Sequence, residues 1–300
     1  MKNALIIGIS GQDGAYLADL LLKEGYNVFG GKRPSASGDL WRLKKLGIEV
    51  EILDCDVLDP GSIERCVDIA QPQEVYNLAA QGHDGISWLL PRYTIDVNAM
   101  GAMNVFQAVG RYGKIFQAST GAMYAGSPCT IEGYGLDTII RPLTPYSIGK
   151  TTAHYMAKAF RQRGHHISCG IMFNHESPLR PEGFVTQKIA KAARGKRIVH
   201  LGNLDAERDW GHARDYVEGM WRLLQHDDPM DLIFATGIKH SVMDFCKAAY
   251  GEKWGDWVVV DEKFYRPADP PVWGNAKKTK EVLGWEPKTT FEDLVKEMVG

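Results

Sequence analysis

The first 30 residues alternate between short apolar runs and an amphipathic segment. An apolar run at 4–8 leads into glycines, Leu17, Leu20 and Leu21 then recur at helical spacing, and a second apolar run occupies 27–30. Short apolar runs without polar alternation are typical of strands buried on both faces, whereas the leucine spacing is typical of a helix. This order predicts a strand, a helix and a second, parallel strand.

The same rhythm continues to about residue 172. Parallel strands need crossover connections, which are usually helices, so the pattern predicts an α/β fold with a doubly wound parallel sheet. Beyond residue 173, clusters of proline, histidine and glycine interrupt shorter elements. We expect one domain over 1–172, rejoined by parts of 207–230, and a smaller mixed α/β domain over most of 173–300, with a ligand cleft between them. The further predicted strands are 50–53, 75–79, 115–118 and 167–171, and the predicted helices are 60–70, 94–109 and 146–163.

Charge and composition exclude several classes of protein. The 35 basic and 37 acidic residues give a net charge of −2 and are mixed along the chain, which argues against nucleic-acid binding. No stretch approaches the roughly 18 to 20 apolar residues that cross a bilayer, so no membrane partner is expected. The five cysteines are an odd number without CxxC spacing. Free thiols in a reducing compartment are the natural interpretation, and we expect a cytoplasmic protein.

A glycine-rich turn follows the first predicted strand. Gly8, Gly11 and Gly14 form G-x-x-G-x-x-G where the strand ends and the helix begins. Glycines there allow a tight turn and a close approach of backbone amides to a pyrophosphate. The spacing differs from the G-x-G-x-x-G of dehydrogenases, and a turn required only for packing is the alternative. The strand–turn–helix context favours a dinucleotide site and a Rossmann fold.

The end of the second strand indicates which dinucleotide is bound. An NAD-binding protein usually places an acidic residue there for the ribose 2′-hydroxyl, but this chain has Lys32 and Arg33. Two cations fit a 2′-phosphate, which favours NADP(H) over NAD, although a solvated basic turn is the alternative. Asp56 and Val57 follow the third strand, and their position alone suggests contact with the adenine ring.

Tyr146 and Lys150 form Y-x-x-x-K, which places both on one face of a predicted helix. A tyrosine with a pKa of about 10 is a poor acid–base catalyst near neutral pH, and we expect the Lys150 ammonium and a cationic nicotinamide to favour its phenolate. An isolated match would be an ordinary helix face, but the hydroxyl pair Ser119–Thr120 ends the fifth strand ahead of it. Thr120, Tyr146 and Lys150 are therefore the predicted catalytic groups, which move a proton while hydride passes to or from the cofactor.

Five longer strings resemble those of a known family across nearly the whole chain. They are GQDGAYL at 11–17, YNLAAQ at 76–81, QAST at 117–120, FNHESP at 173–178 and RDWGHA at 208–213. They are similar to strings of GDP-mannose 4,6-dehydratases, within the extended short-chain dehydrogenases. The resemblance implies a GDP-sugar substrate, a tightly held NADP(H), and a homodimer or homotetramer.

The resemblance also implies roles for individual residues. It adds to the cofactor site Gln12, Asp13, Leu78, Ala79 and Ala80, and places at the nucleotide diphosphate Asn174, Lys188, Arg208 and Arg266. Asp269 stands where the family's R-P-x-E has its glutamate, a partner for the guanine edge. A chain of net charge −2 has to assemble local donors for a diphosphate, which agrees with these cations.

His175 and Glu176 could suggest a metal site. No second pair at ligand spacing accompanies them, so we expect buried, hydrogen-bonded loop residues and no metal.

The chain departs from the family at one catalytic position. The dehydratases read S-T-S-E, whose glutamate removes the C5 proton of a 4-keto sugar, whereas this chain reads Ser119-Thr120-Gly121-Ala122. A positioned general base contributes about 10² to 10⁴ in rate, so its loss would slow elimination but not hydride transfer at C4. The family's Q-S-H-V likewise reads Gln81-Gly82-His83-Asp84 here.

Three hypotheses follow. The favoured one is an NADPH-dependent reductase of a GDP-4-keto-6-deoxyhexose, in which Tyr146 donates the proton, Lys150 tunes it and Thr120 orients the ketone. The second is a 4,6-dehydratase in which another acid, Asp84 or Glu132, replaces the missing base. The third is a non-catalytic partner subunit or sensor that binds NADP(H).

Overall fold

The computed structural model describes residues 1–34, 40–110, 113–264 and 271–300. At its centre is a seven-stranded sheet in the order β11-β6-β5-β4-β1-β2-β3, with parallel pairing throughout. This sheet confirms the predicted doubly wound α/β fold. Its strands are β1 (Asn3–Ile7), β2 (Asn27–Lys32), β3 (Glu51–Asp54), β4 (Glu74–Asn77), β5 (Lys114–Thr120), β6 (Ile167–Met172) and β11 (Asp231–Phe234).

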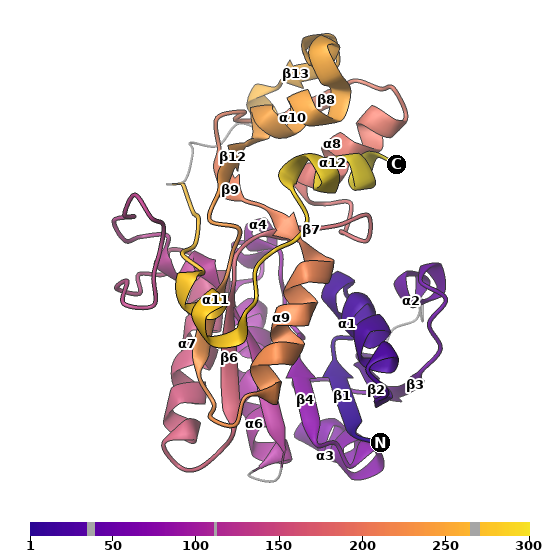
Figure 1. Ribbon diagram of the computed structural model, residues 1–300, viewed down its shortest axis with the longest axis vertical. Coiled ribbons are helices and arrows are strands. Elements are labelled where there is room, and N and C mark those ends of the chain that lie inside the picture. Colours follow the sequence, from indigo (N-terminus) through magenta and orange to yellow (C-terminus); the bar gives the residue numbers. More distant parts are fainter. Residues whose placement is uncertain (35–39, 111–112, 265–270) are drawn as a thin grey trace.

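Helices cover both faces of the sheet (Figure 1). Because successive strand residues point to opposite faces, Ala4 and Ile6 pack in one apolar cluster while Leu5 and Ile7 pack in another. One face carries α1 (Gln12–Lys23), α2 (Trp41–Lys45), α9 (Ala213–Gln225) and α11 (Lys277–Leu283). The other carries α3 (Pro60–Ala70), α6 (Gly101–Val109) and α7 (Pro145–Arg161). Within the described ranges, no helix is both long and apolar enough to cross a membrane.

Two differences from the predicted elements concern the central sheet and the helical segment after β4. The predicted helix 94–109 is divided into α5 (Pro91–Ile95), a π-helical turn η1 (Asp96–Met100) and α6. Within that turn, the Asn98 side chain bonds the backbone N–H and C=O of Gln81, which fixes the turn to the loop after β4. Strand β11 was not predicted, because it lies beyond residue 173, where the alternation of apolar runs and helical stretches breaks up.

A smaller lobe lies beyond the carboxyl ends of the strands, at the top of Figure 1. Its apolar cluster joins α8 (Val185–Arg194), α10 (Val242–Tyr250) and α12 (Phe291–Val299). The chain returns from this lobe to the sheet through α9, and also through β11 and α11, which lie outside the predicted return at 207–230. Two-stranded ladders and short helices complete the structure: β7 (His175–Glu176) with β10 (Gly211–His212), β8 (Val199–Leu201) with β13 (Val258–Val260), β9 (Glu207–Asp209) with β12 (Lys239–Ser241), α4 (Asp84–Ser87), η2 (Gly121–Tyr124), η3 (Gly251–Asp256) and η4 (Glu262–Phe264).

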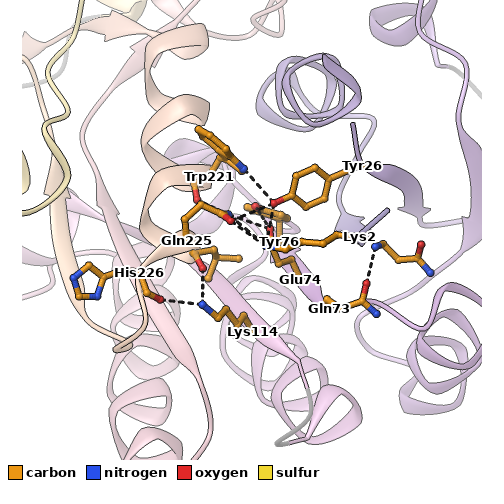
Figure 2. A network of polar contacts seen from close by, with 11 residues as sticks. Lys2, Tyr26, Gln73, Glu74, Tyr76, Lys114, Trp221, Gln225 and His226 are labelled. Atoms are coloured by element: carbon orange, nitrogen blue, oxygen red, sulfur yellow. Dashed lines mark hydrogen bonds and ion pairs between the residues drawn. The ribbon is translucent and has the colours of Figure 1, made fainter. Parts of the chain in front are cut away.

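A buried carboxylate ties α9 to the amino ends of the strands (Figure 2). Glu74, the first residue of β4, accepts hydrogen bonds from Lys2 Nζ at 3.0 Å, Tyr26 Oη at 3.1 Å and Tyr76 Oη at 2.8 Å. Gln225 Nε2, at the end of α9, lies 3.3 Å from both Glu74 oxygens. The negative charge is thereby surrounded by donors, as a buried carboxylate requires.

Candidate active site

A cavity of about 950 Å³ opens at the carboxyl ends of the parallel strands. One part of its wall comes from the loops that follow β1 to β5 and from the start of α7. The other comes from the segment after β6, up to Phe184, and from Arg208 of the second half of the chain. Ligands of open α/β sheets bind at this edge, so the cavity is the candidate active site.

The glycine turn forms one end of the cavity. Gly8 has a φ of +95°, and a Cβ there would lie 2.9 Å from the backbone nitrogen of Ala79. A Cβ on Gly14 would lie 2.6 Å from the carbonyl oxygen of Gly8. Gly11 precedes α1 without a side-chain cap from the described residues, and the first turn of α1 lines the cavity. Packing therefore requires these glycines, and the uncapped helix end also fits a dinucleotide phosphate.

The predicted cofactor residues all lie on this cavity wall. They are Gly8, Gly11, Gln12, Asp13, Gly14, Lys32, Arg33, Asp56, Val57, Leu78, Ala79, Ala80, Tyr146 and Lys150. The Arg33 guanidinium donates to the hydroxyl of Tyr93 on α5. Asp56 Oδ1 accepts from the backbone N–H of Leu58 at 3.0 Å. The wall thus combines a glycine turn with two cations at the end of β2, which fits a nicotinamide dinucleotide.

The predicted catalytic groups converge on the same cavity. Helix α7 begins at Pro145, where Thr144 and Ser147 form a capping box, and this start places Tyr146 in the first turn. Tyr146 hydrogen-bonds Thr120 at the end of β5. Lys150 Nζ donates to the Ala118 carbonyl at 2.8 Å. A strand end and a helix start therefore bring together two hydroxyls and an amine.

Burial sets the acidity of these groups. It lowers the pKa of Lys150, which is 4% exposed, to about 8. Burial also raises the pKa of Tyr146, and the hydrogen bond from Thr120 and the charge of Arg180 oppose that rise. The prediction that Lys150 and a cationic nicotinamide together favour the phenolate concerns the cofactor-bound site and stays a prediction, whereas in the protein alone the pKa of Tyr146 is raised. Desolvation outweighs the charge of Arg180, the cation that most opposes the rise in the protein alone.

Arg180 is the main cavity residue that the sequence reasoning missed. Its Nε lies 3.0 Å from Glu176 Oε2, and its guanidinium lies 3.6 Å from the ring centroid of Phe184. Glu176 is buried and accepts from Thr186 Oγ1 at 2.7 Å. The guanidinium is thus held on the cavity wall. The sequence signal that could have identified Arg180 was its position two residues after the FNHESP string.

The same segment is fastened to the first turn of α1. His175 Nε2 lies 2.9 Å from Asp13 Oδ2, and Ser177 Oγ donates to Gln12 Oε1 at 2.7 Å. Burial opposes charge on both members of the His175–Asp13 pair. Their attraction prevails, raising the pKa of His175 and lowering that of Asp13. Glu176 is buried and hydrogen-bonded as predicted, but it lies in the short strand β7 and not in a loop, and His175 lies on the cavity wall.

The structure brings together part of the predicted diphosphate set. Asn174 and Arg208 line the cavity. Lys188 is outside the wall, on α8, with its Nζ 4.5 Å from the ring centroid of Phe264. Arg266 and Asp269 lie outside the described residues.

Among the described residues, His154, Cys169 and Asp231 form one group with metal-ligand spacing. This group is separate from the cavity wall. Asp231 already bonds the Arg161 guanidinium at 2.5 Å, with Lys158 Nζ at 3.5 Å. Two cations at the only carboxylate of the group make it a poor cation site.

The sequence left open which acidic side chain could replace the missing base at residue 122. Ala122 lines the cavity with a methyl group where the resemblance places a glutamate. Asp84, also on the wall, accepts a 2.6 Å hydrogen bond from Thr144 Oγ1. Glu132 is exposed, outside the wall, and accepts from Asn275 Nδ2 at 3.3 Å. Of the two candidate substitute bases, only Asp84 therefore lies at the cavity.

Solved structures share this architecture. The chain is similar to a UDP-glucose 4-epimerase of Thermotoga maritima, with a TM-score of 0.90 and 24% identity, covering 99% of this chain and 97% of that one. It is also similar to a dTDP-glucose 4,6-dehydratase of Bacillus anthracis in complex with NAD, with a TM-score of 0.87 and 20% identity, covering 100% and 96%. At these identities the likeness shows the fold.

Sequence relatives indicate the family more specifically than these solved structures do. A family model described as GDP-mannose 4,6 dehydratase matches residues 5–298. The chain is 40% identical to GDP-mannose 4,6 dehydratase 2 of Arabidopsis thaliana, covering 99% of this chain and 86% of the relative. It is also 40% identical to a GDP-mannose 4,6-dehydratase of Sinorhizobium fredii, covering 99% and 95%. The chain therefore belongs to the GDP-mannose 4,6-dehydratase family.

Proposed function

We propose that the protein is an NADP(H)-dependent 4,6-dehydratase of a GDP-linked hexose, with GDP-mannose as the first substrate to test. The observation that carries this proposal is the convergence of Thr120, Tyr146 and Lys150 on one cavity, in a chain whose relatives are named GDP-mannose 4,6-dehydratases. The names of these relatives favour dehydration over the reductase expected from residue 122 alone.

Thr120, Tyr146 and Lys150 have separate roles at C4 of the sugar. When bound, the nicotinamide accepts and returns a hydride. Tyr146 takes the proton of the C4 hydroxyl, and Thr120, which hydrogen-bonds Tyr146, orients that hydroxyl. Lys150, anchored on the Ala118 carbonyl, holds a positive charge below a pH of about 8 and stabilises the phenolate.

Lys32 and Arg33 support NADP(H) as the preferred cofactor. Both line the cavity after β2, where a ribose 2′-phosphate would lie. Asn174 and Arg208 are the proposed contacts of the substrate diphosphate, with Arg180 as an additional cation on the wall. A cytoplasmic location and a homodimer or homotetramer remain part of this proposal.

One assay tests the proposed reaction. The protein is incubated with NADP⁺ and GDP-mannose, and the nucleotide sugars are analysed by mass spectrometry. Dehydration gives a product lighter by one water. If no such product forms at any enzyme concentration while the protein binds both ligands, dehydration is not the activity.

A second candidate function is reduction of a GDP-4-keto-6-deoxyhexose by NADPH. Ala122 favours this candidate, because reduction at C4 needs no base at C5, whereas elimination does. Oxidation of NADPH by GDP-4-keto-6-deoxymannose, without water loss from GDP-mannose, would identify the reductase. Binding without either reaction would identify a non-catalytic NADP(H)-binding protein.

A further inference from the structure

The proposed dehydration requires a base that takes the C5 proton, and Ala122 cannot supply one. We propose that Asp84 is this base, an inference that rests on the proposed function. Two observations single out the residue: its carboxylate lies on the cavity wall, and Thr144 holds it directly before the helical turn that carries Tyr146.

The other acidic residues of the wall have other partners. Within the described residues, the carboxylates on the wall are Asp13, Asp56 and Asp84. Asp13 is paired with His175 at the glycine turn, and Asp56 bonds its own loop after β3. Asp84 begins α4, which packs against α7. Of the three, only Asp84 is hydrogen-bonded to the cap of the helix that bears Tyr146.

Thr144 fixes the direction of the carboxylate. Its Oγ1 accepts from the backbone N–H of Ser147 at 3.2 Å as the cap of α7 and donates to Asp84 Oδ1 at 2.6 Å. The described residues give Asp84 Oδ2 no hydrogen bond or ion pair, so that oxygen is available to accept a proton. Asp84 is also near enough to Tyr146 for its charge to contribute to the raised pKa of the tyrosine.

The elimination of water across C5 and C6 needs only one carboxylate. Once C4 is a ketone, the C5–H bond is acidic. Asp84 takes the proton, and the electron pair of that bond forms the C5=C6 double bond as the C6–O bond breaks. The proton from C5 and the hydroxide from C6 together make one water. The double bond is saturated when the hydride removed from C4 adds at C6 and a proton adds at C5. Because Asp84 is exposed to solvent in the cavity, that proton comes from solvent.

The test is a single turnover of the NADP⁺-loaded Asp84→Asn variant with GDP-mannose in D₂O. We expect the absorbance of reduced nicotinamide to appear and persist, because C4 is oxidised but C5 is not deprotonated. Dehydrated product and deuterium at C5 should fall by about 10² to 10⁴ fold relative to the natural protein. Glu132→Gln, which removes an exposed carboxylate away from the cavity, is the matched control and should match the natural protein.

A second variant separates loss of the base from damage to the site. Asp84→Asn combined with Ala122→Glu places a carboxylate at the family's position and should restore water loss and deuterium incorporation. The proposal is overturned if Asp84→Asn dehydrates at the natural rate, or if it loses cofactor reduction together with dehydration. If the natural protein itself does not dehydrate GDP-mannose, the proposed function fails before this inference is reached.

Discussion

Titratable side chains are buried at both ends of the parallel sheet, but their surroundings differ. At the amino ends, Glu74 is surrounded by donors from Lys2, just before β1, from β4 and from α9 (Figure 2). At the carboxyl ends, Tyr146 and Lys150 are enclosed with few partners and face a cavity. A fully partnered buried charge stabilises one arrangement of the fold, whereas a poorly partnered one has its pKa displaced and can exchange protons with a ligand.

This difference shows that burial alone does not identify a functional residue. Glu74 and Lys150 are both almost fully buried. The number of partners and the presence of a cavity distinguish the structural group from the chemical one. Substitutions at the two ends should therefore affect different measurements.

The largest effect is expected for Tyr146→Phe. Loss of the hydroxyl removes the proton carrier and should lower hydride transfer by about 10² to 10⁴ fold, or roughly 3 to 5 kcal/mol of barrier. The free energy of unfolding should change by only about 1 kcal/mol, since one hydrogen bond is lost. Stopped-flow absorbance of the cofactor and denaturant unfolding measure the two. Tyr155→Phe, on the exposed side of α7, is the control.

Glu74→Ala should show the opposite pattern. Tyr76 and Gln225 lose their acceptor in a buried place, which should lower the free energy of unfolding by about 2 to 4 kcal/mol. The kcat/KM of the folded protein should stay unchanged, and Glu64→Ala on the exposed side of α3 should affect neither. Loss of activity without loss of stability would contradict the assigned structural role.

Burial of Lys150 should make the free energy of unfolding depend on pH. Its pKa is about 8 in the folded protein and about 10.4 when unfolded. Between these values the unfolded chain binds more protons, so stability rises with pH. Relative to Lys150→Met, the cofactor-free natural protein should gain about 2 kcal/mol between pH 8 and pH 10. Denaturant unfolding measures this difference, with Lys158→Met on the same helix as the control. An unchanged difference would show that the ammonium is not desolvated.

The smallest effect is expected for Arg33→Ala at the cofactor end of the cavity. Loss of one charge-assisted contact should raise the Kd of NADP(H) by about tenfold, while the Kd of NAD(H) should not change. Fluorescence of the reduced cofactor measures both constants. The control is Arg65→Ala, an exposed cation of α3 away from the cavity. Equal weakening of both cofactors would show that Arg33 does not contact a 2′-phosphate.

Features that depend on neighbours in the chain were well predicted. The six strands of the first 172 residues are confirmed, and α3 occupies the predicted range, because buried strands and amphipathic helices leave local periodic patterns. The glycine turn and Y-x-x-x-K were likewise predicted by spacing. Strand β11 was missed because it lies beyond residue 173, where the regular alternation of strand and helix patterns breaks up.

The sequence by itself determined the α/β architecture, the glycine turn and the spacing of Tyr146 and Lys150, since each follows from backbone geometry over a few residues. Only the tertiary structure decided which acidic residue is bonded to the cap of the helix that carries Tyr146, because Asp84 and Thr144 are 60 positions apart. It also decided that burial raises the pKa of Tyr146 and that Arg180 opposes this effect. Desolvation and charge depend on distances in space between groups, and the order of residues along the chain does not give those distances directly.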